Sequence, residues 1–341
     1  MQRDNGTTPK PSQRYVLCRP RGGLNDTLCQ IELCWRYAER YQRQLIIDCG
    51  ASGGLHGDFG LYFQPRHLSQ LPIITRLDNN LIEQLNTLSC CPVELTSQIG
   101  QPNRDAIWSE ADHEFRDPIS GTSLTFNFHS DHRESILIHE QCGGGNLSFY
   151  LLERLRFSRS SSDHIQARIT PLGHNYIAIH IRNTDYRTDY QNFLSCLAPQ
   201  LAGMSVLICS DDARVFTAAE ELLPHSSLLQ ASETPNLDGL ALHGPDAPIN
   251  PDWRHEQTLA ALVDLVALAH GKKLHITNTT LGELSGFSRL AKHLNANKDV
   301  IGSLLGQNNL ISFHHHWRRH IFLHNIKQSI KLNSLAQGLF A

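Results

Sequence analysis

The second half of the sequence alternates short apolar runs with longer helical stretches, and this alternation constrains the fold more than any other feature. Continuous aliphatic or β-branched runs are typical of strands covered on both faces, as in parallel sheets flanked by helices. The expected order is strand 176–181, helix 192–201, strand 206–209, helix 213–223, strand 228–230, a loop at 234–252, helix 255–270, strand 274–277 and helix 284–294. This order predicts a doubly wound α/β domain.

The first half predicts a second domain of the same class. We expect strands at 15–18, 45–48 and 136–139 and a long helix at 24–42, whereas the stretch 50–135 is rich in Gly, Pro, Asn and Asp and predicts loops and short elements. A chain of 341 residues exceeds one ordinary core. The expected architecture is a disordered terminus at 1–13, Rossmann-like domains at 14–172 and 173–310 facing one cleft, and a basic helical tail at 311–341.

Composition narrows the class of protein. Hydrophobic residues make up 40% and charged residues 18%, and the sequence lacks both a run long enough to span a membrane and the apolar core of a signal peptide. The nine cysteines lack the spacing of a disulfide framework or of paired zinc-ligand motifs, which predicts a reduced, cytoplasmic location. A net charge of -3 provides no global attraction for nucleic acid. Only His314, His315 and His316 cluster, and adjacent histidines point in different directions on a helix, so we expect no metal site there.

The C-terminal segment is basic. No acidic residue follows Asp299, whereas Arg318, Arg319, Lys327 and Lys331 remain. Two interpretations stay open. The favoured one is a last helix that packs back across the first domain, and the alternative is an interfacial helix that contacts anionic lipid at the inner face of the membrane.

Polar residues follow the strand at 176–181, at the edge of a parallel sheet where ligands bind. The segment reads HIRNTDY, and Arg182 offers a planar fork of donors that suits phosphate oxygens. The alternative is that Arg182 forms an ion pair with Asp185 or Asp189 and only closes the loop. The two are compatible, because Asp185 can orient Arg182 while Arg182 contacts a ligand.

Two further strand ends carry candidate binding groups. Ser210, Asp211 and Asp212 follow one strand. A carboxylate there could accept hydrogen bonds from a ribose or base, or it could cap the next helix. The adjacent pair of aspartates could alternatively hold a divalent metal. At 278–289, hydroxyls and backbone N–H groups at a helix start predict a second phosphate contact. The alternative is that these hydroxyls only cap the helix. Gly286 would allow a ligand to approach closely. Glycine-rich turns at 21–26 and 139–146 point flexible loops at the same cleft.

Together these segments resemble a known superfamily. HIRNTD resembles the H-x-R-R-x-D motif of the alpha-1,2, alpha-1,6 and protein-O-fucosyltransferases, SDDA resembles their second motif, TNTTLGELSGFSRLA their third, and GGLND their N-terminal turn. The resemblance covers about Tyr15 to Leu294. It implies a GT-B glycosyltransferase that moves a sugar, with GDP-fucose as the expected donor, to a glycan or glycoconjugate hydroxyl, with inversion and without a required metal or other cofactor.

The resemblance also implies which residues bind the donor. Arg182 matches the donor-phosphate arginine, Asp211 or Asp212 the nucleotide-side acid, and Ser285 a phosphate-contacting serine. The full expected donor set is His180, Arg182, Asn183, Ser210, Asp211, Asp212, Asn278, Thr279, Thr280, Ser285, Gly286, Phe287, Ser288 and Arg289. On the N-terminal side, the expected cleft residues are Gly22, Gly23, Leu24, Asn25 and Asp26.

One residue departs from the superfamily pattern, and one role has no single candidate. Asn183 stands where the motif has a second arginine, so a different nucleotide sugar, or a protein that binds a nucleotide or phosphosugar without transfer, remains an alternative. The expected catalytic residues are Arg182, Asp185 and Glu140. Asp58 and Glu110 are further candidates for the general base, with His139 behind them.

Overall fold

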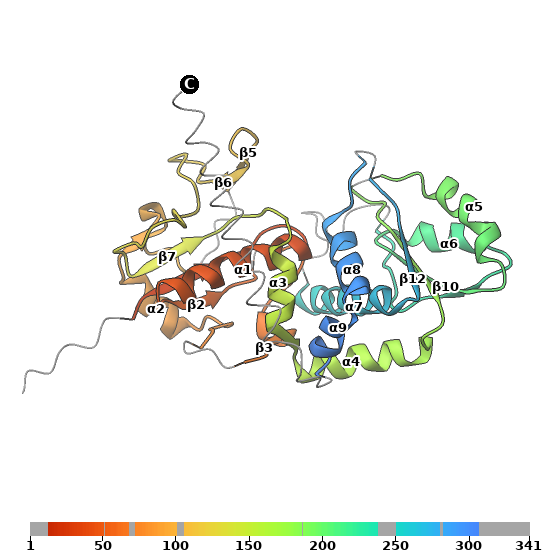
Figure 1. Cartoon of the computed structure of the whole chain (residues 1–341). Coiled ribbons are helices and arrows are strands. Elements are labelled where there is room, and N and C mark those ends of the chain that lie inside the picture. The colour runs from red at the N-terminus through yellow and green to blue at the C-terminus, as the bar shows by residue number, and fades with distance from the viewer. Residues whose placement is uncertain are drawn as a thin grey trace, which may run out of the picture.

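The computed structural model describes residues 13–50, 52–67, 72–100, 106–185, 187–237, 250–279 and 282–306. Figure 1 shows two lobes side by side, the first built from the N-terminal half and the second from the C-terminal half of the described chain. Each lobe is centred on a four-stranded sheet whose strands run parallel. The predicted α/β class with two Rossmann-like sheets is confirmed.

The first lobe contains the sheet β2-β1-β7-β4, formed by Gln44–Ile47, Tyr15–Cys18, Ile136–His139 and Cys90–Cys91. The residues of β1, β2 and β7 are nearly all buried, as continuous apolar runs predict. Helix α1 (Leu24–Arg40) packs against β1 and β2, and α3 (Leu147–Arg154) packs against α1. The stretch 50–135 forms the short elements expected of it: η1 (Phe59–Leu61), β3 (Phe63–Pro65), α2 (Asn79–Asn86), η2 (Val93–Leu95), β5 (Ile107–Ser109) and β6 (Glu114–Arg116).

The second lobe contains the sheet β11-β10-β9-β12, formed by Ser227–Leu229, Ser205–Ser210, Ile177–Ile181 and Lys273–Ile276. Alternate residues of β9 and β10 face two separate apolar clusters. One face packs on α5 (Tyr190–Leu201) and α6 (Ala213–Leu222), and the other on α7 (Pro251–His270) and α8 (Gly286–Ala296). The lobe is therefore a three-layer α/β sandwich, which places β9 in its centre.

Three helix starts differ from the sequence expectation by two to four residues because a side chain caps each helix. Asp189 accepts a hydrogen bond from Asn192 N, so α5 begins at Tyr190. Asn250 caps α7, which begins at Pro251 inside the expected loop. Ser285 accepts from Ser288 N, so α8 begins at Gly286 and not at 284.

Two helices connect the lobes. Figure 1 shows α4 (Arg159–Ile169) below the second lobe, where it packs against α7; it follows β8 (Leu155–Phe157) and precedes η3 (Thr170–Leu172). Helix α9 (Lys298–Leu304) returns to the first lobe and packs against α3 and β8. The chain thus crosses back before 306. The tail predicted at 311–341, its basic residues and the histidines at 314–316 lie outside the described residues.

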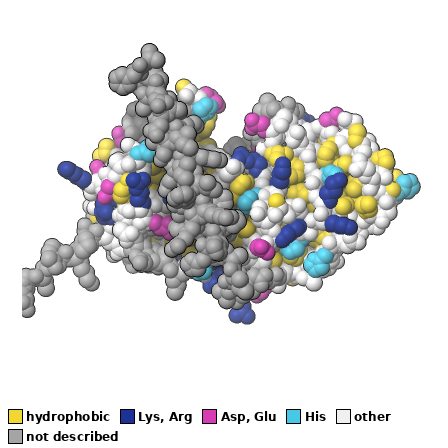
Figure 2. Space-filling model, in the orientation of Figure 1, with side chains coloured by type: hydrophobic (Ala, Val, Ile, Leu, Met, Phe, Trp, Pro, Cys, Tyr) yellow, Lys and Arg dark blue, Asp and Glu magenta, His cyan; other side chains and the backbone are white. Residues whose placement is uncertain are grey.

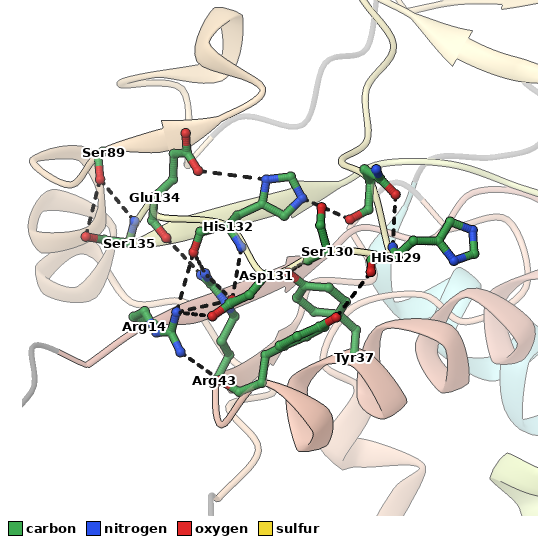
Figure 3. A network of polar contacts seen from close by, with 12 residues as sticks. Arg14, Tyr37, Arg43, Ser89, His129, Ser130, Asp131, His132, Glu134 and Ser135 are labelled. Carbon is green, nitrogen blue, oxygen red and sulfur yellow. Dashed lines mark hydrogen bonds and ion pairs between the residues drawn. The ribbon is translucent and has the colours of Figure 1, made fainter.

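A polar network lies at the amino-terminal ends of the strands of the first sheet (Figure 3). Asp131 binds Arg14 at 2.9 Å and Arg43 at 3.2 Å, and Arg43 also donates to the carbonyl of Glu134 at 2.8 Å. Tyr37 Oη donates to the carbonyl of Ser130 at 2.9 Å. These contacts join the residues that precede β1, β2 and β7. They hold the amino-terminal ends of these strands together, whereas the predicted site lies at the carboxyl ends.

On the face seen in Figure 2, basic and acidic side chains both occur on each lobe. Within the described ranges, none of the helices combines the length and the hydropathy needed to cross a membrane.

Candidate functional site

A cavity of about 540 Å³ lies between the lobes. Residues after the carboxyl ends of β9 and β10 line it from the second lobe, and the turn after β1 lines it from the first. The largest cleft at the carboxyl edges of parallel strands is where such folds bind ligands. All five predicted N-terminal cleft residues line it: Gly22, Gly23, Leu24, Asn25 and Asp26.

Arg182 lies in the cavity wall and is held by two carboxylates. Its Nε donates to Asp185 Oδ1 at 2.8 Å, and its Nη1 lies 3.0 Å from Asp211 Oδ2. The predicted ion pair with Asp185 and the predicted place in the cleft therefore coexist. The Arg182 side chain remains 16% exposed, so it is fixed in direction and still open to a ligand.

The two adjacent aspartates have different surroundings. Asp211 lines the cavity and accepts hydrogen bonds from Asn183 N at 2.8 Å and from the Thr184 hydroxyl. Asp212 caps α6 and binds Arg214 and the Asn183 side chain, and it is not among the residues that line the cavity. Burial alone would raise the pKa of Asp212, but the hydrogen bonds from Arg214 and Asn183 lower it. Asp212 thus has the capping role, and Asp211 faces the cavity.

The start of α8 forms the adjacent part of the wall. Ser285 Oγ accepts from Ser288 N at 3.1 Å and contacts Ser288 Oγ at 2.8 Å, which in turn contacts His180 Nδ1 at 2.9 Å. Burial, with a smaller effect of the charge on Arg182, lowers the pKa of His180 to about 3. His180 is therefore neutral at physiological pH and links β9 to α8.

The first lobe meets α8 closely at this point. A Cβ on Gly286 would lie 2.8 Å from Asn25 Cβ, so the absence of a side chain there lets α8 approach α1. Arg289 donates to Asn146 Oδ1 at 2.6 Å across the same boundary. The helix start that the sequence placed in the second lobe is thus joined to the glycine-rich turn of the first.

The predicted donor set divides into two groups. Asn183, Asp212, Asn278 and Ser288 are not among the residues that line the cavity, and Thr280 lies outside the described residues. Of these, Asn183, Asp212 and Ser288 form hydrogen bonds to neighbouring side chains instead. The members of the set that line the cavity are His180, Arg182, Ser210, Asp211, Thr279, Ser285, Gly286, Phe287 and Arg289. Asp185, which was predicted as a catalytic residue, lines it as well.

The expected base candidates do not line the cavity. Glu140 is fully buried and forms ion pairs with Arg21 at 2.5 Å and Arg19 at 3.7 Å, so its carboxylate is engaged inside the first lobe and lies away from solvent. Asp58 caps η1 by accepting from Gly60 N at 2.7 Å, and Glu110 is exposed in the β5–β6 turn. His139 is buried between Thr125 and Gln30, and burial lowers its pKa to about 3.

Asp264 was missed by the sequence analysis. It lies on α7, lines the cavity, is 9% exposed and accepts a hydrogen bond from Ser232 Oγ at 2.8 Å. Burial raises its pKa to about 7. A lone acid inside an apolar helix run, in LVDLV, was the available signal, because buried carboxyls are rare without a partner or a function.

Within the described ranges, the structure contains no group of three or more His, Cys, Asp or Glu side chains placed to hold a metal ion. All nine cysteines are free.

Two parallel α/β lobes with a cavity at their facing strand ends define a GT-B architecture, and the comparisons agree with it. No family model matches the chain. Nodulation protein Z of Sinorhizobium fredii is 23% identical over 284 residues, which cover 75% of this chain and 84% of that protein. The predicted resemblance to the fucosyltransferase superfamily is therefore confirmed at the level of sequence similarity.

Two solved structures show the same fold. NodZ alpha-1,6-fucosyltransferase co-crystallised with GDP matches with a TM-score of 0.53 and 19% identity, over 83% of this chain and 92% of its own. Fucosyltransferase NodZ from Bradyrhizobium matches with a TM-score of 0.53 and 20% identity, over 83% of this chain and 93% of its own. These similarities confirm the GT-B fold.

Proposed function

We propose that this protein is a glycosyltransferase that moves fucose from GDP-fucose to a glycan or glycoconjugate hydroxyl, with inversion at the anomeric carbon. The observation that carries the proposal is Arg182, held by Asp185 and Asp211 in the wall of the inter-lobe cavity beside the start of α8. The similar nodulation protein Z and the NodZ structures, one with GDP and one soaked with GDP-fucose, support this donor class.

The phosphate end of the donor would contact Arg182 and the start of α8. An arginine offers paired N–H donors to phosphate oxygens, and a helix start adds unpaired N–H groups and a partial positive charge. Both stabilise the negative charge that develops on the departing diphosphate. Because an arginine and a helix start can supply the charge stabilisation that a divalent cation would provide, we propose that transfer needs no metal and no other cofactor. Turnover should therefore be unchanged by EDTA.

The base end would lie near Asp264. A guanine presents two adjacent N–H donors on its base-pairing edge, and a carboxylate accepts both. Asp264 is the buried carboxyl of the cavity, with Ser232 donating to one of its oxygens. We therefore propose that Asp264 selects GDP. The Asp264→Asn protein should bind GDP more weakly, with the preference for GDP over UDP and CMP reduced, as measured by isothermal titration calorimetry.

The primary experiment combines a donor screen with a matched pair of variants. Thermal-shift measurements with GDP-, UDP-, ADP- and CMP-sugars identify the donor, and release of the nucleotide measures turnover. Arg182→Ala should reduce turnover about 100-fold or more, because it removes a donor to the leaving group. Arg187→Ala, an exposed arginine of the same loop, is the control and should leave turnover unchanged. Normal turnover by Arg182→Ala would refute the mechanism.

A non-catalytic nucleotide or phosphosugar binder is the second candidate, and Asn183 favours it. Its backbone and side-chain amides bind Asp211 and Asp212, so the second arginine of the motif is replaced by a residue with a local structural role. Tight binding of a nucleotide sugar without any nucleotide release would establish this function. A screen in which UDP- or CMP-sugars bind best would instead indicate another donor.

We also propose that the protein resides in the cytoplasm. Within the cytoplasm it would either be freely soluble or contact the inner face of the membrane through residues 311–341. The motivation is the run of basic residues without acidic ones after Asp299. Deleting residues 312–341 should reduce sedimentation with vesicles that contain anionic lipid. Equal sedimentation of the two proteins would exclude this contact.

A further inference from the structure

The proposed transfer needs a group on the acceptor side of the cavity that accepts a proton. The donor contacts proposed above belong to the second lobe, so an acceptor hydroxyl would approach from the first-lobe wall of the cavity. Among the described residues of the first lobe that line the cavity, two have titratable side chains, Asp26 and His56. The further inference rests on the proposed function and concerns the choice between these two groups.

Asp26 is already used by the turn that carries it. Its Oδ2 accepts a hydrogen bond from Gly23 N at 3.2 Å, which caps the start of α1. Its side chain also fills the space beside two glycines, since a Cβ on Gly22 would lie 3.0 Å from Asp26 Cβ and one on Gly144 2.8 Å from Asp26 Oδ1. Asp26 therefore shapes the glycine-rich wall and is a poor candidate for proton transfer.

The loop that carries His56 is held at many points. Ser52 Oγ accepts from Gly54 N at 3.1 Å and Leu55 N at 3.0 Å and contacts Thr27 Oγ1 at 2.7 Å. Gly53 N donates to Gly22 O at 3.0 Å, and Leu55 is fully buried. The loop from 52 to 55 is thus bonded to the same turn that begins α1, which fixes the backbone immediately before His56.

The carbonyl of His56 is held from the other side. Tyr62 Oη donates to His56 O at 2.9 Å and lies 2.9 Å from His255 Nδ1 on α7 of the second lobe. The backbone of His56 is thus held on both sides, which limits the positions that its side chain can take, and proton transfer to a bound hydroxyl requires such limited positions. The side chain of His56 itself is half-buried and lines the cavity.

We propose that His56 is the general base of the transfer. Its neutral imidazole accepts the proton of the acceptor hydroxyl as that oxygen forms a bond to the anomeric carbon. The bond from that carbon to the diphosphate oxygen breaks, and its electron pair leaves with GDP, whose charge Arg182 stabilises. The imidazolium then releases the proton to water, so the step balances without another reactant.

Other acids of the cavity belong to the second lobe. Asp185 and Asp211 bind Arg182, and Asp264 is buried on α7. Glu233 and Glu283 are exposed and are the competing bases that the experiment must distinguish. Titratable groups around the His56 loop also affect a pH profile. Asp58 follows His56 by two residues, and Asp26 lies on the adjoining turn. Tyr62 of the same lobe binds the carbonyl of His56, and His255 of the second lobe contacts Tyr62.

The experiment compares His56→Gln with His225→Gln, an exposed histidine between α6 and β11. With GDP-fucose as donor and water as acceptor, His56→Gln should lower kcat for GDP release by about 100-fold or more while the Kd for GDP stays within about twofold. Its rate should also lose the decrease at acidic pH that protonation of a histidine base imposes. The control should match the unchanged protein in all three measurements.

A second variant tests whether the imidazole itself acts. His56→Ala should regain part of its turnover when imidazole is added, whereas Glu283→Gln and Glu233→Gln should keep most of theirs. An unchanged kcat in His56→Gln, or no response of His56→Ala to imidazole, would overturn the role of His56 and leave the proposed function intact. No GDP release by the unchanged protein would refute the proposed function itself, and this inference with it.

Discussion

At the scale of single residues, the cavity orients Arg182 through side chains that also hold the surrounding backbone. Asp211 binds Arg182 and accepts from the backbone of Asn183, and the Asn183 side chain binds Asp212. An arginine at 183 would bring a second positive charge to this buried position, where Arg214 already pairs with the Asp212 oxygen that the Asn183 amide contacts. The departure from the superfamily motif is therefore built into the local packing.

Asp264 gives a residue-scale prediction about stability. Burial raises its pKa to about 7, so the folded protein keeps a proton that the unfolded chain loses near pH 4, and stability is lost as pH rises through this interval. Asp264→Asn should gain stability relative to the unchanged protein between pH 5 and pH 8, by roughly 1–3 kcal/mol. Urea unfolding at both pH values measures the change. Glu256→Gln, at an exposed acid on α7, is the control, and an equal effect of the two variants would contradict the prediction.

At the scale of secondary-structure elements, the sequence predicted three strands of the first sheet, all four of the second, and α1, α5, α6, α7 and α8, since apolar runs and helical periodicity report burial directly. Strand β4, which has two residues, and helices α3, α4 and α9 were not predicted. Helix starts were displaced where Asp189, Asn250 and Ser285 act as caps, because a cap is recognised only when its hydrogen bond is seen. The loop at His56 was missed although GGLHGD follows a strand, as the other site segments do. The strand before this loop is short and the residues around it show only a weak pattern, so the loop was not recognised as a segment that follows a strand and lines the site.

The contact between α1 and α8 gives an element-scale prediction. A methyl group at Gly286 would lie 2.8 Å from Asn25 Cβ, so Gly286→Ala should push the start of α8 away from α1 and displace Ser285 and Phe287 in the cavity wall. We expect GDP to bind about tenfold more weakly and unfolding to cost about 1–3 kcal/mol less. Lys292→Ala, on the exposed side of α8, should change neither. Titration calorimetry and thermal unfolding provide the measurements, and unaltered GDP affinity in Gly286→Ala would disprove the close-packing argument.

At the scale of the whole molecule, the lobes are joined by more than the ligand cavity. One apolar cluster runs from β1 and α1 of the first lobe through α7 and α8 of the second. Phe149 on α3 stacks on His293 of α8 with ring centroids 4.0 Å apart, and Ser162 of α4 donates to the carbonyl of Leu305 after α9. The sequence could not predict these contacts, because pairing between distant helices leaves no local pattern. The two lobes should consequently unfold in one transition.

Buried and half-buried histidines should determine how that transition depends on pH. Burial lowers the pKa values of His139 and His180 to about 3, and lowers those of His270, His275 and His293 from the usual value near 6.5. Below about pH 6.5 the unfolded chain binds protons that the folded protein excludes, so stability falls as pH decreases. Glu32 and Asp264, whose pKa values are raised, act in the opposite direction but are fewer.

We therefore expect the melting temperature to fall as the pH decreases from 7.5 to 5.5. The free energy of unfolding should decrease by about 1.4 kcal/mol per pH unit for each net proton taken up on unfolding. Gln in place of His139 keeps hydrogen-bonding groups beside Thr125 and Gln30 but cannot titrate. The number of protons taken up on unfolding should therefore decrease by about one, and the melting temperature should depend less on pH. His225→Gln should leave this pH dependence unchanged, because that histidine is exposed in the folded protein. Circular dichroism melts of the three proteins measure the effect. A melting temperature that stays constant or rises on acidification would show that exclusion of protons by buried histidines does not control the stability of the joined lobes.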